Sequence, residues 1–450
     1  MTVIDETFTP HHPRRAWAAV ALLAVVGTLN YADRFLPAVL AEPIKNDLAL
    51  SDTAIGVING FWFLAVYAVL GLVIARIADR GAFGLVISTC LTVWGAMTML
   101  GGAVQSAFQL ALTRVGVAVG EAGSTPAAHA YVARNFPPER RAAPLAVITM
   151  SIPLASAASL LGGGLLAQTL GWRTAFVVMG AISVVVAPLV LLVLGRRQPM
   201  PVAVASAGDK VQAAKVVDLL KKPSFLAVVL GAAFISFAGY SLTTFAPAYL
   251  IRTREMSLGE VGVQYGLASG LTGILSLLIV GWVADRLSAK DPRWSLWLVA
   301  AMTAVMLPFS ALAFLVESRT LCIWFISLSY VVGTAYMAPS IAAIQRLARV
   351  EQRATASAIF LFFGAMVGSA GPFLTGVISD ALAADLDNMS LGRALLIVPV
   401  AQVIAIICYL VASRRFVREM VASEDGLGPR TAEMALGVSA KPTPPATPHQ

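Results

Sequence analysis

Long apolar runs separated by short polar loops dominate the pattern of hydrophobic and polar positions along the chain. A helix that crosses the hydrocarbon core of a bilayer needs about 20 predominantly apolar residues, and most of the runs reach that length. We therefore predict twelve membrane-spanning helices, at residues 16–41, 52–78, 84–106, 108–134, 142–168, 172–195, 223–251, 257–284, 294–316, 320–346, 353–382 and 391–413.

The composition supports a membrane protein. Of the 450 residues, 58% are hydrophobic and 12% are charged, whereas a soluble domain is about 45–50% apolar and 25% charged. So few charged side chains cannot cover this much apolar surface in water. The first run contains Asn30, Asp33 and Arg34 and has no small-residue cleavage site, so we interpret it as a retained helix and not as a signal peptide.

The basic residues set the orientation. Most of the 32 Lys and Arg residues lie in tails and loops on the same side as the N-terminus, which predicts cytoplasmic termini and a multi-pass protein of the inner (plasma) membrane. This bias explains the net charge of +8 without a nucleic-acid partner. The expected parts are a cytoplasmic tail (1–15), a six-helix bundle (16–195), a cytoplasmic linker (196–222), a second six-helix bundle (223–415) and a disordered cytoplasmic tail (416–450).

Several classes of function lack their motifs. The three cysteines, Cys90, Cys322 and Cys408, all lie in apolar runs, so neither a disulfide framework nor a zinc site can be read from them. There is no P-loop, no metal-ligand cluster and no set of nucleophile and base. We expect no cofactor, no metal and no catalytic residue, and therefore not an enzyme.

Short signals recur in the two halves of the chain. The run Ala75–Gly81 contains Asp79-Arg80 after the second predicted span, and Gly281–Leu287 contains Asp285-Arg286 after the eighth. Matched signals at about half the chain length indicate a duplicated bundle. Secondary transporters are commonly built in this way, with the binding site between the halves near the middle of the membrane.

Four charges lie inside predicted spans of the first half, namely Asp33, Arg34, Arg114 and Glu121. Charges at such positions are costly and functional by default. At a rise of 1.5 Å per residue, Asp33 and Arg114 have a similar depth and could pair, and Glu121 lies near the midplane. We predict Asp33 and Glu121 as proton-coupling residues; the alternative for Asp33 and Arg114 is a static ion pair. His129, toward the cytoplasm, is either a relay or a packing residue.

The second half has no acidic residue at mid-membrane depth. Its seventh span offers Phe237, Tyr240 and Thr243, an aromatic wall with hydroxyl groups. A charged first half facing an apolar second half suits an amphipathic substrate, with its charged head near Tyr31, Arg34 and Arg114. The alternative for each aromatic residue is packing or contact with lipid.

The G-x-x-x-D-R pattern of Gly281, Asp285 and Arg286 resembles the loop signature of the major facilitator superfamily. The first half departs from it, because Ala75 replaces the leading glycine. This resemblance implies an all-helical membrane protein of two six-helix bundles. It also implies gating roles for Asp79, Arg80, Asp285 and Arg286, as latches on the cytoplasmic face that break on opening.

Two branches of that family share the pattern Asn-Tyr-x-Asp-Arg in the first span and Arg-(six residues)-Glu-Ala in the fourth: sugar-acid symporters and Spinster-like lipid transporters. The stretch from Phe245 to Arg252 looks more like the Spinster-like branch. The resemblance implies a proton-coupled, alternating-access monomer that moves a lipid such as a lysophospholipid or a sphingosine-phosphate-like molecule. The alternatives are symport of a small organic anion such as a sugar acid, and multidrug efflux.

Overall fold

The computed structural model describes residues 13–67, 70, 82–137, 140–195, 218–349 and 352–424, and all regular elements in these ranges are helices. The first half contains α1 (Pro13–Val39), α2 (Ala41–Leu48), α3 (Asp52–Gly56), η1 (Val57–Trp62), α5 (Phe83–Gly101), α6 (Ala107–Glu121), α7 (Ser124–Asn135), α8 (Ala142–Thr149), α9 (Ser151–Ala158), η3 (Ser159–Gly163), α10 (Gly164–Leu170) and α11 (Trp172–Leu194). The second half contains α13 (Pro223–Arg252), α14 (Leu258–Glu260), η4 (Val261–Tyr265), α15 (Gly266–Ser288), α16 (Trp294–Leu312), α17 (Arg319–Ala335), α18 (Met337–Leu347), α19 (Arg353–Leu386), η6 (Asp387–Met389), α20 (Ser390–Ala394) and α21 (Ile397–Glu424).

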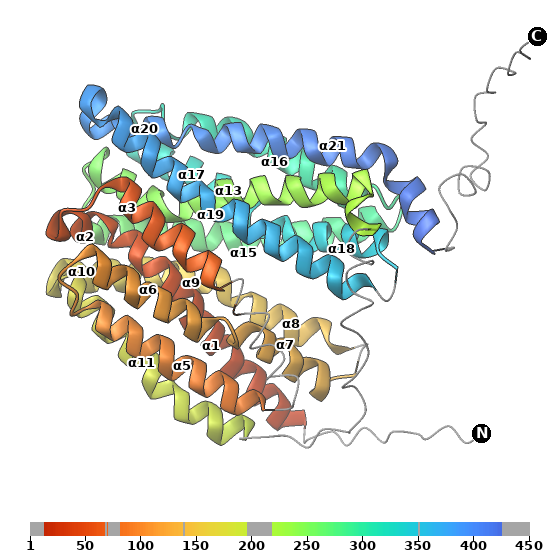
Figure 1. The fold of residues 1–450 in the computed structure, drawn as a ribbon, viewed down its shortest axis with the longest axis horizontal. Coiled ribbons are helices and arrows are strands. Elements are labelled where there is room, and N and C mark those ends of the chain that lie inside the picture. The colour runs from red at the N-terminus through yellow and green to blue at the C-terminus, as the bar shows by residue number, and fades with distance from the viewer. Residues whose placement is uncertain are drawn as a thin grey trace, which may run out of the picture.

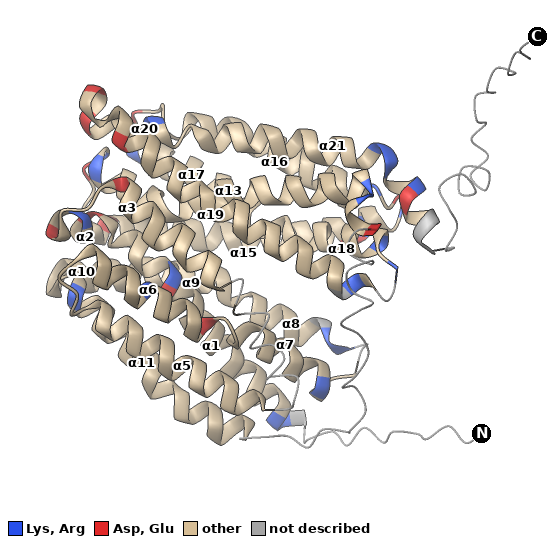
Figure 2. Ribbon diagram, viewed as in Figure 1, with Lys and Arg blue, Asp and Glu red and all other residues tan. Residues whose placement is uncertain are grey.

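The two halves form two helical bundles that lie side by side (Figure 1). We call the end where α3 begins and α13 finishes the Arg252 end, and the opposite end, where α11 finishes and α13 begins, the linker end. Figure 2 shows most charged residues gathered at these two ends. Asp79, Arg80 and most of the predicted linker lie outside the described residues, and α21 continues to Glu424, past the predicted boundary at 415.

In the described residues, the predicted apolar runs are mainly helical. Within the described residues, nine helical stretches are long and apolar enough to cross a membrane, and the last of them, Thr355–Val421, takes in both α19 and α21. The second predicted span is described only in part, and the fourth is broken between α6 and α7. The prediction of an all-helical membrane fold is confirmed; the number of twelve spans remains a prediction.

Serine side chains start four helices at the Arg252 end. Ser51, Ser106, Ser257 and Ser318 each accept a hydrogen bond from the backbone N–H three residues later. Such N-caps satisfy donors that have no partner inside the helix, and each is worth about 1 kcal/mol. These local sequences therefore fix where the helices begin.

The halves meet through glycines at pseudo-equivalent positions. A Cβ atom at Gly56 would lie 2.3 Å from the carbonyl oxygen of Pro372, and a Cβ atom at Gly262 would lie 2.5 Å from that of Leu160. Gly262 follows Gly56 by 206 residues, and Pro372 follows Leu160 by 212. Glycine is required because the partner backbone occupies the space of a side chain. The duplication expected from the sequence therefore extends to the contacts between the halves.

Three π-helical turns lie at this interface. Gly60 of η1 packs against Pro372 of α19, while Leu160 of η3 packs against Gly262 and Gly266 at η4 and the start of α15. π-Helical turns are frequent at functional sites. Three of the segments that touch across the halves therefore depart from regular α-helix, beside regular helices such as α3 and α19.

Candidate functional site

A cavity of about 390 Å³ lies between the two bundles, a volume within the range of small-molecule sites. Helices α1, α6, α13, α15, α17 and α18 contribute to its lining. The lining reaches toward the linker end through Leu277, Gly281 and Ile341, and it includes neither Asp52 nor Arg252 at the opposite end. Among the described residues of this lining, Arg34 and Arg114 are the charged ones, and both come from the first half.

Glu121 and Arg34 form an ion pair behind this wall. Arg34 Nε donates to Glu121 Oε2 at 2.6 Å, and the Glu121 side chain is completely buried. Glu121 is the last residue of α6, directly before the break to α7. Gly120 lets α6 approach Trp94 of α5 closely, since a Cβ atom there would lie 2.5 Å from the Trp94 backbone nitrogen. The glycine and the helix break together fix the position of the carboxylate.

Aromatic rings hold the two cavity arginines in place. The Arg34 guanidinium lies 4.3 Å from the ring centre of Tyr67 and 5.0 Å from that of Tyr31. Phe63 lies between the two cations, 5.5 Å from the Arg34 guanidinium and 4.9 Å from that of Arg114. Cation–π contacts of this kind stabilise a desolvated cation. They allow two positive groups to share one wall of a largely apolar cavity.

Asp33 is held by a residue that the sequence did not indicate. Thr98 Oγ1 of α5 donates to Asp33 Oδ2 at 2.5 Å, and both side chains are buried. Arg114 Nη1 lies 3.5 Å from the backbone oxygen of Asp33, and no nitrogen of Arg114 lies within 4.0 Å of the Asp33 carboxylate. The pair suggested by depth, Asp33 with Arg114, is therefore not formed, and the ion pair forms between Arg34 and Glu121.

Several buried polar atoms in this group have no partner among the described residues. They are Asp33 Oδ1, Arg34 Nη2, Arg114 Nε and Glu121 Oε1. A buried polar atom without a hydrogen bond costs free energy, and native structures keep few of them. The unused N–H groups of the two arginines can bind an anionic group, and the unused carboxylate oxygens can take up a proton.

Some of the residues predicted for substrate binding line the cavity, and their binding role remains a prediction. Tyr240 and Thr243 line the cavity, as does Tyr31 from the first half. Phe237 does not: it is buried in the core, and its backbone oxygen meets α19 at Gly371. Phe237, predicted for substrate binding, is therefore not among the residues that line the cavity in this structure. His129 also lies outside the cavity lining.

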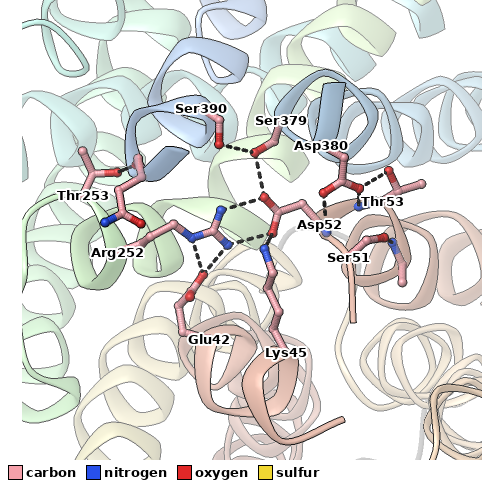
Figure 3. A network of polar contacts seen from close by, with 12 residues as sticks. Glu42, Lys45, Ser51, Asp52, Thr53, Arg252, Thr253, Ser379, Asp380 and Ser390 are labelled. Carbon is pink, nitrogen blue, oxygen red and sulfur yellow. Dashed lines mark hydrogen bonds and ion pairs between the residues drawn. The ribbon is translucent and has the colours of Figure 1, made fainter. Parts of the chain in front are cut away.

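The two ends of the molecule differ in their charge contacts. At the Arg252 end, Arg252 of α13 binds Glu42 of α2 and Asp52 of α3, so that ion pairs join the halves (Figure 3). At the linker end, Asp285 has no side-chain partner among the described residues, and Arg286 stacks on Trp282 at 3.8 Å. The contacts of Arg252 were not predicted from the sequence. The available signal was a positive charge, Arg252, directly after the predicted span 223–251 and a negative charge, Asp52, at the start of the predicted span 52–78.

Comparisons with known proteins agree with this architecture. The family model described as Major Facilitator Superfamily matches residues 23–372. A Mycolicibacterium smegmatis protein named MFS-type efflux pump is 70% identical over 412 residues, which cover 91% of this chain and 96% of that protein. Human protein spinster homolog 1 is 27% identical over 397 residues, covering 82% of this chain and 74% of the human protein.

A solved structure shares both fold and sequence with this chain. It is a bacterial homologue of the human lysosomal transporter Spinster in an inward-facing, unoccupied conformation. The TM-score is 0.79 at 27% identity, and the alignment covers 91% of this chain and 99% of the other. With a duplicated helical fold, a cavity between its halves and a family match over most of its length, the chain belongs to the Major Facilitator Superfamily of transporters and is related to the Spinster proteins.

Proposed function

We propose that the protein is a proton-coupled transporter of an amphipathic molecule with an anionic head, which works by alternating access. Asp33 and Glu121 are the proton-coupling residues of this proposal, and Arg34 and Arg114 bind the head. The favoured substrate is a lipid such as a lysophospholipid or a sphingosine-phosphate-like molecule. The proposed setting is a bacterial inner membrane, and the proposed working unit is a monomer.

One observation carries the proposal: the cavity has charge on one wall only. Its two charged residues, Arg34 and Arg114, both come from the first half and both keep an unpartnered N–H group. The described residues of the opposite wall carry no charge; they offer aliphatic side chains and hydroxyl groups, among them those of Tyr240, Thr243 and Tyr330. An anionic head can pair with the arginines while an apolar chain lies on the other wall.

The contact of Arg34 with Glu121 suggests how proton and substrate could be coupled. Both the buried carboxylate and an anionic head compete for the same guanidinium. Binding of the head would draw Arg34 away from Glu121, and an unpaired buried carboxylate favours its protonated form. Protonation of Glu121 would in turn free Arg34 for the head.

Export of drug-like molecules is the second candidate, and the relative named as an efflux pump, at 70% identity, favours it. The aromatic and apolar residues of the second half would also accept such molecules. Symport of a small sugar acid is the third. A sugar acid needs polar groups on both walls, and the hydroxyl groups of the second half could supply them, whereas the aliphatic residues beside these hydroxyls favour a substrate with an apolar part.

The experiment is transport in proteoliposomes with an imposed pH gradient. A labelled lysophospholipid, a sugar acid and a cationic dye are compared for the wild type, Asp33→Asn and Glu121→Gln. We expect gradient-driven movement of the lipid, and at least a tenfold loss in both variants. Glu255→Gln is the matched control. It makes the same change at a carboxylate whose side chain is 84% exposed and is not part of the cavity lining.

Each outcome distinguishes the candidates. Movement of the dye without the lipid would replace the lipid proposal by drug efflux, and movement of the sugar acid alone would support the symporter. If either carboxylate variant moved the substrate at the wild-type rate under the same gradient, that residue would have no part in proton coupling.

A further inference from the structure

At the Arg252 end, a side chain of the second half caps a helix of the first half. Asp380 of α19 accepts hydrogen bonds from the backbone nitrogens of Asp52 and Thr53, at 3.0 and 2.8 Å, and from Thr53 Oγ1 at 2.6 Å (Figure 3). These nitrogens belong to the first turn of α3, where helix donors lack partners inside the helix. The carboxylate therefore supplies, from the opposite bundle, what the helix start requires.

The reverse contact exists on the other side of the same end. Gln168 of α10, in the first half, accepts a hydrogen bond at 2.6 Å from the backbone nitrogen of Gly259 in α14, in the second half. A Cβ atom at Gly259 would lie 2.1 Å from Gln168 Oε1, so glycine leaves the room that the amide occupies. Each half thus caps a helix of the other.

The two cross-caps are pseudo-equivalent. Gly259 follows Thr53 by 206 residues, and Asp380 follows Gln168 by 212. The same offsets relate the glycine contacts between the halves, Gly56 with Pro372 and Gly262 with Leu160. One ancestral contact, present twice, accounts for both caps.

The caps are not equally strong. Asp380 accepts three hydrogen bonds on a carboxylate, whereas one hydrogen bond is formed on the neutral amide of Gln168. Hydrogen bonds to an ionised acceptor are roughly twice as strong as neutral ones. Asp380 also holds the backbone of Asp52, the residue whose carboxylate binds Arg252. Asp52 Oδ2 accepts from Arg252 Nη1 at 2.7 Å and from Ser379 Oγ at 2.6 Å.

We propose that Asp380 and Gln168 are a pair of gate residues, whose cross-caps form when the Arg252 end closes and break when it opens. Asp380 is the dominant member, because its loss removes three hydrogen bonds and loosens the Asp52–Arg252 ion pair. The proposal rests on the alternating-access part of the proposed function. It does not depend on the substrate or on proton coupling.

The test measures the separation of the halves at this end. Spin labels are attached at Gln105→Cys and Glu317→Cys, two exposed positions in loops of different halves, after replacement of Cys90, Cys322 and Cys408 by serine. Double electron–electron resonance in nanodiscs then gives the distance distribution without any substrate. We expect a short distance to dominate in this background, and Asp380→Leu to raise the ratio of long to short distances at least tenfold.

Gln168→Met, which keeps the volume but loses the acceptor, should raise that ratio less than Asp380→Leu. The matched control is Asp385→Leu, the same change at an exposed position of the same helix. Asp380→Asn is added in case the leucine variant fails to fold, and should give an intermediate shift. An Asp380 variant with the distribution of the Asp385 control, or a larger effect of Gln168→Met, would overturn the proposal. A shift in distance with unchanged transport would retain the cross-caps as contacts that hold this end closed, but would reject the alternating-access function and with it the role of Asp380 and Gln168 as gate residues.

Discussion

At the scale of single residues, Arg34 makes several kinds of contact with one guanidinium group. Its Nε binds Glu121, its planar group stacks on Tyr67 and Tyr31, and its Nη2 has no partner among the described residues. A guanidinium can do all three because it is planar and carries five donors, whereas a lysine ammonium is a compact point charge.

Arg34→Lys should therefore keep the charge and lose the geometry. We expect the half-saturating concentration of the substrate to rise about tenfold, which is about 1.4 kcal/mol of binding free energy. Initial transport rates over a range of substrate concentrations provide the measurement. Arg319→Lys, at a 53% exposed side chain, is the control; an Arg34→Lys protein with wild-type saturation would remove Arg34 from the binding site.

Thr98 gives a prediction about stability. Thr98→Val removes the hydroxyl that donates to buried Asp33, and the loss of such a partner costs about 1–3 kcal/mol. We expect a lower melting temperature in detergent for Thr98→Val and a near-native value for Thr98→Ser, which keeps the donor. Equal melting temperatures of the valine and serine variants would contradict the role of the hydroxyl.

The same residues show which features of the site could be predicted from the sequence. That Asp33, Arg34, Arg114 and Glu121 would form one group was predictable, because charges in spans must find partners. The pairing among these four residues was not predictable, because the depth of a residue in the membrane does not tell in which direction its side chain points around the helix axis. Asp33 and Arg34 are adjacent and so point about 100° apart on a helix, and only Arg34 reaches Glu121. Thr98 gave no signal, since one threonine in an apolar run is ordinary.

At the scale of elements, α13 explains why Phe237 could not be placed from the sequence. This helix is apolar around its whole circumference and is packed by α19 and α21 as well as facing the cavity. A pattern without a polar face cannot indicate which aromatic residues line a cavity. The length of the apolar runs was enough to predict the helices. It was not enough to predict the π-helical turns, because these turns lie at contacts between the halves.

The glycines at these contacts can be tested in a matched pair. Gly56→Ala would place a methyl group 2.3 Å from the Pro372 oxygen, whereas a Cβ atom at Gly162 would meet nothing within 4 Å. We expect Gly56→Ala to destabilise the protein by about 1–3 kcal/mol, as overpacking does. Gly162→Ala should be neutral or slightly stabilising, since alanine favours helix over glycine.

Thermal unfolding in detergent measures both variants under one condition. Gly262→Ala, the pseudo-equivalent of Gly56→Ala, should behave like it, because its Cβ atom would lie 2.5 Å from the Leu160 oxygen. Indistinguishable melting temperatures for Gly56→Ala and Gly162→Ala would mean that the two bundles can separate there without loss.

At the scale of the whole molecule, the halves are joined at the Arg252 end, and the cavity reaches toward the linker end. The bias of basic residues would make this the inward-facing arrangement, which is also the conformation of the solved Spinster homologue at TM-score 0.79. A latch at the linker end should be open in this arrangement. The side chain of Asp285 has no partner among the described residues, which do not include Asp79 and Arg80.

Asp285→Asn should therefore leave this conformation intact and weaken the opposite one. We expect a several-fold lower transport rate with an unchanged melting temperature, measured on the same preparation. Asp385→Asn, an exposed aspartate at the other end, serves as the control. A fall in melting temperature together with the rate would indicate that Asp285 stabilises the present arrangement and is not a latch of the other.

The one-sided charge of the cavity has a consequence for the shape of what is carried. If the arginines of one bundle bind the head and the uncharged wall of the other takes the chain, as proposed, the cargo would lie crosswise and bridge both bundles at one depth. A crosswise cargo does not have to turn end over end as the bundles rock. The width of the cavity would then set a minimum length for the substrate. A molecule too short to touch both walls would bind one bundle only and would not couple its binding to the movement of the other.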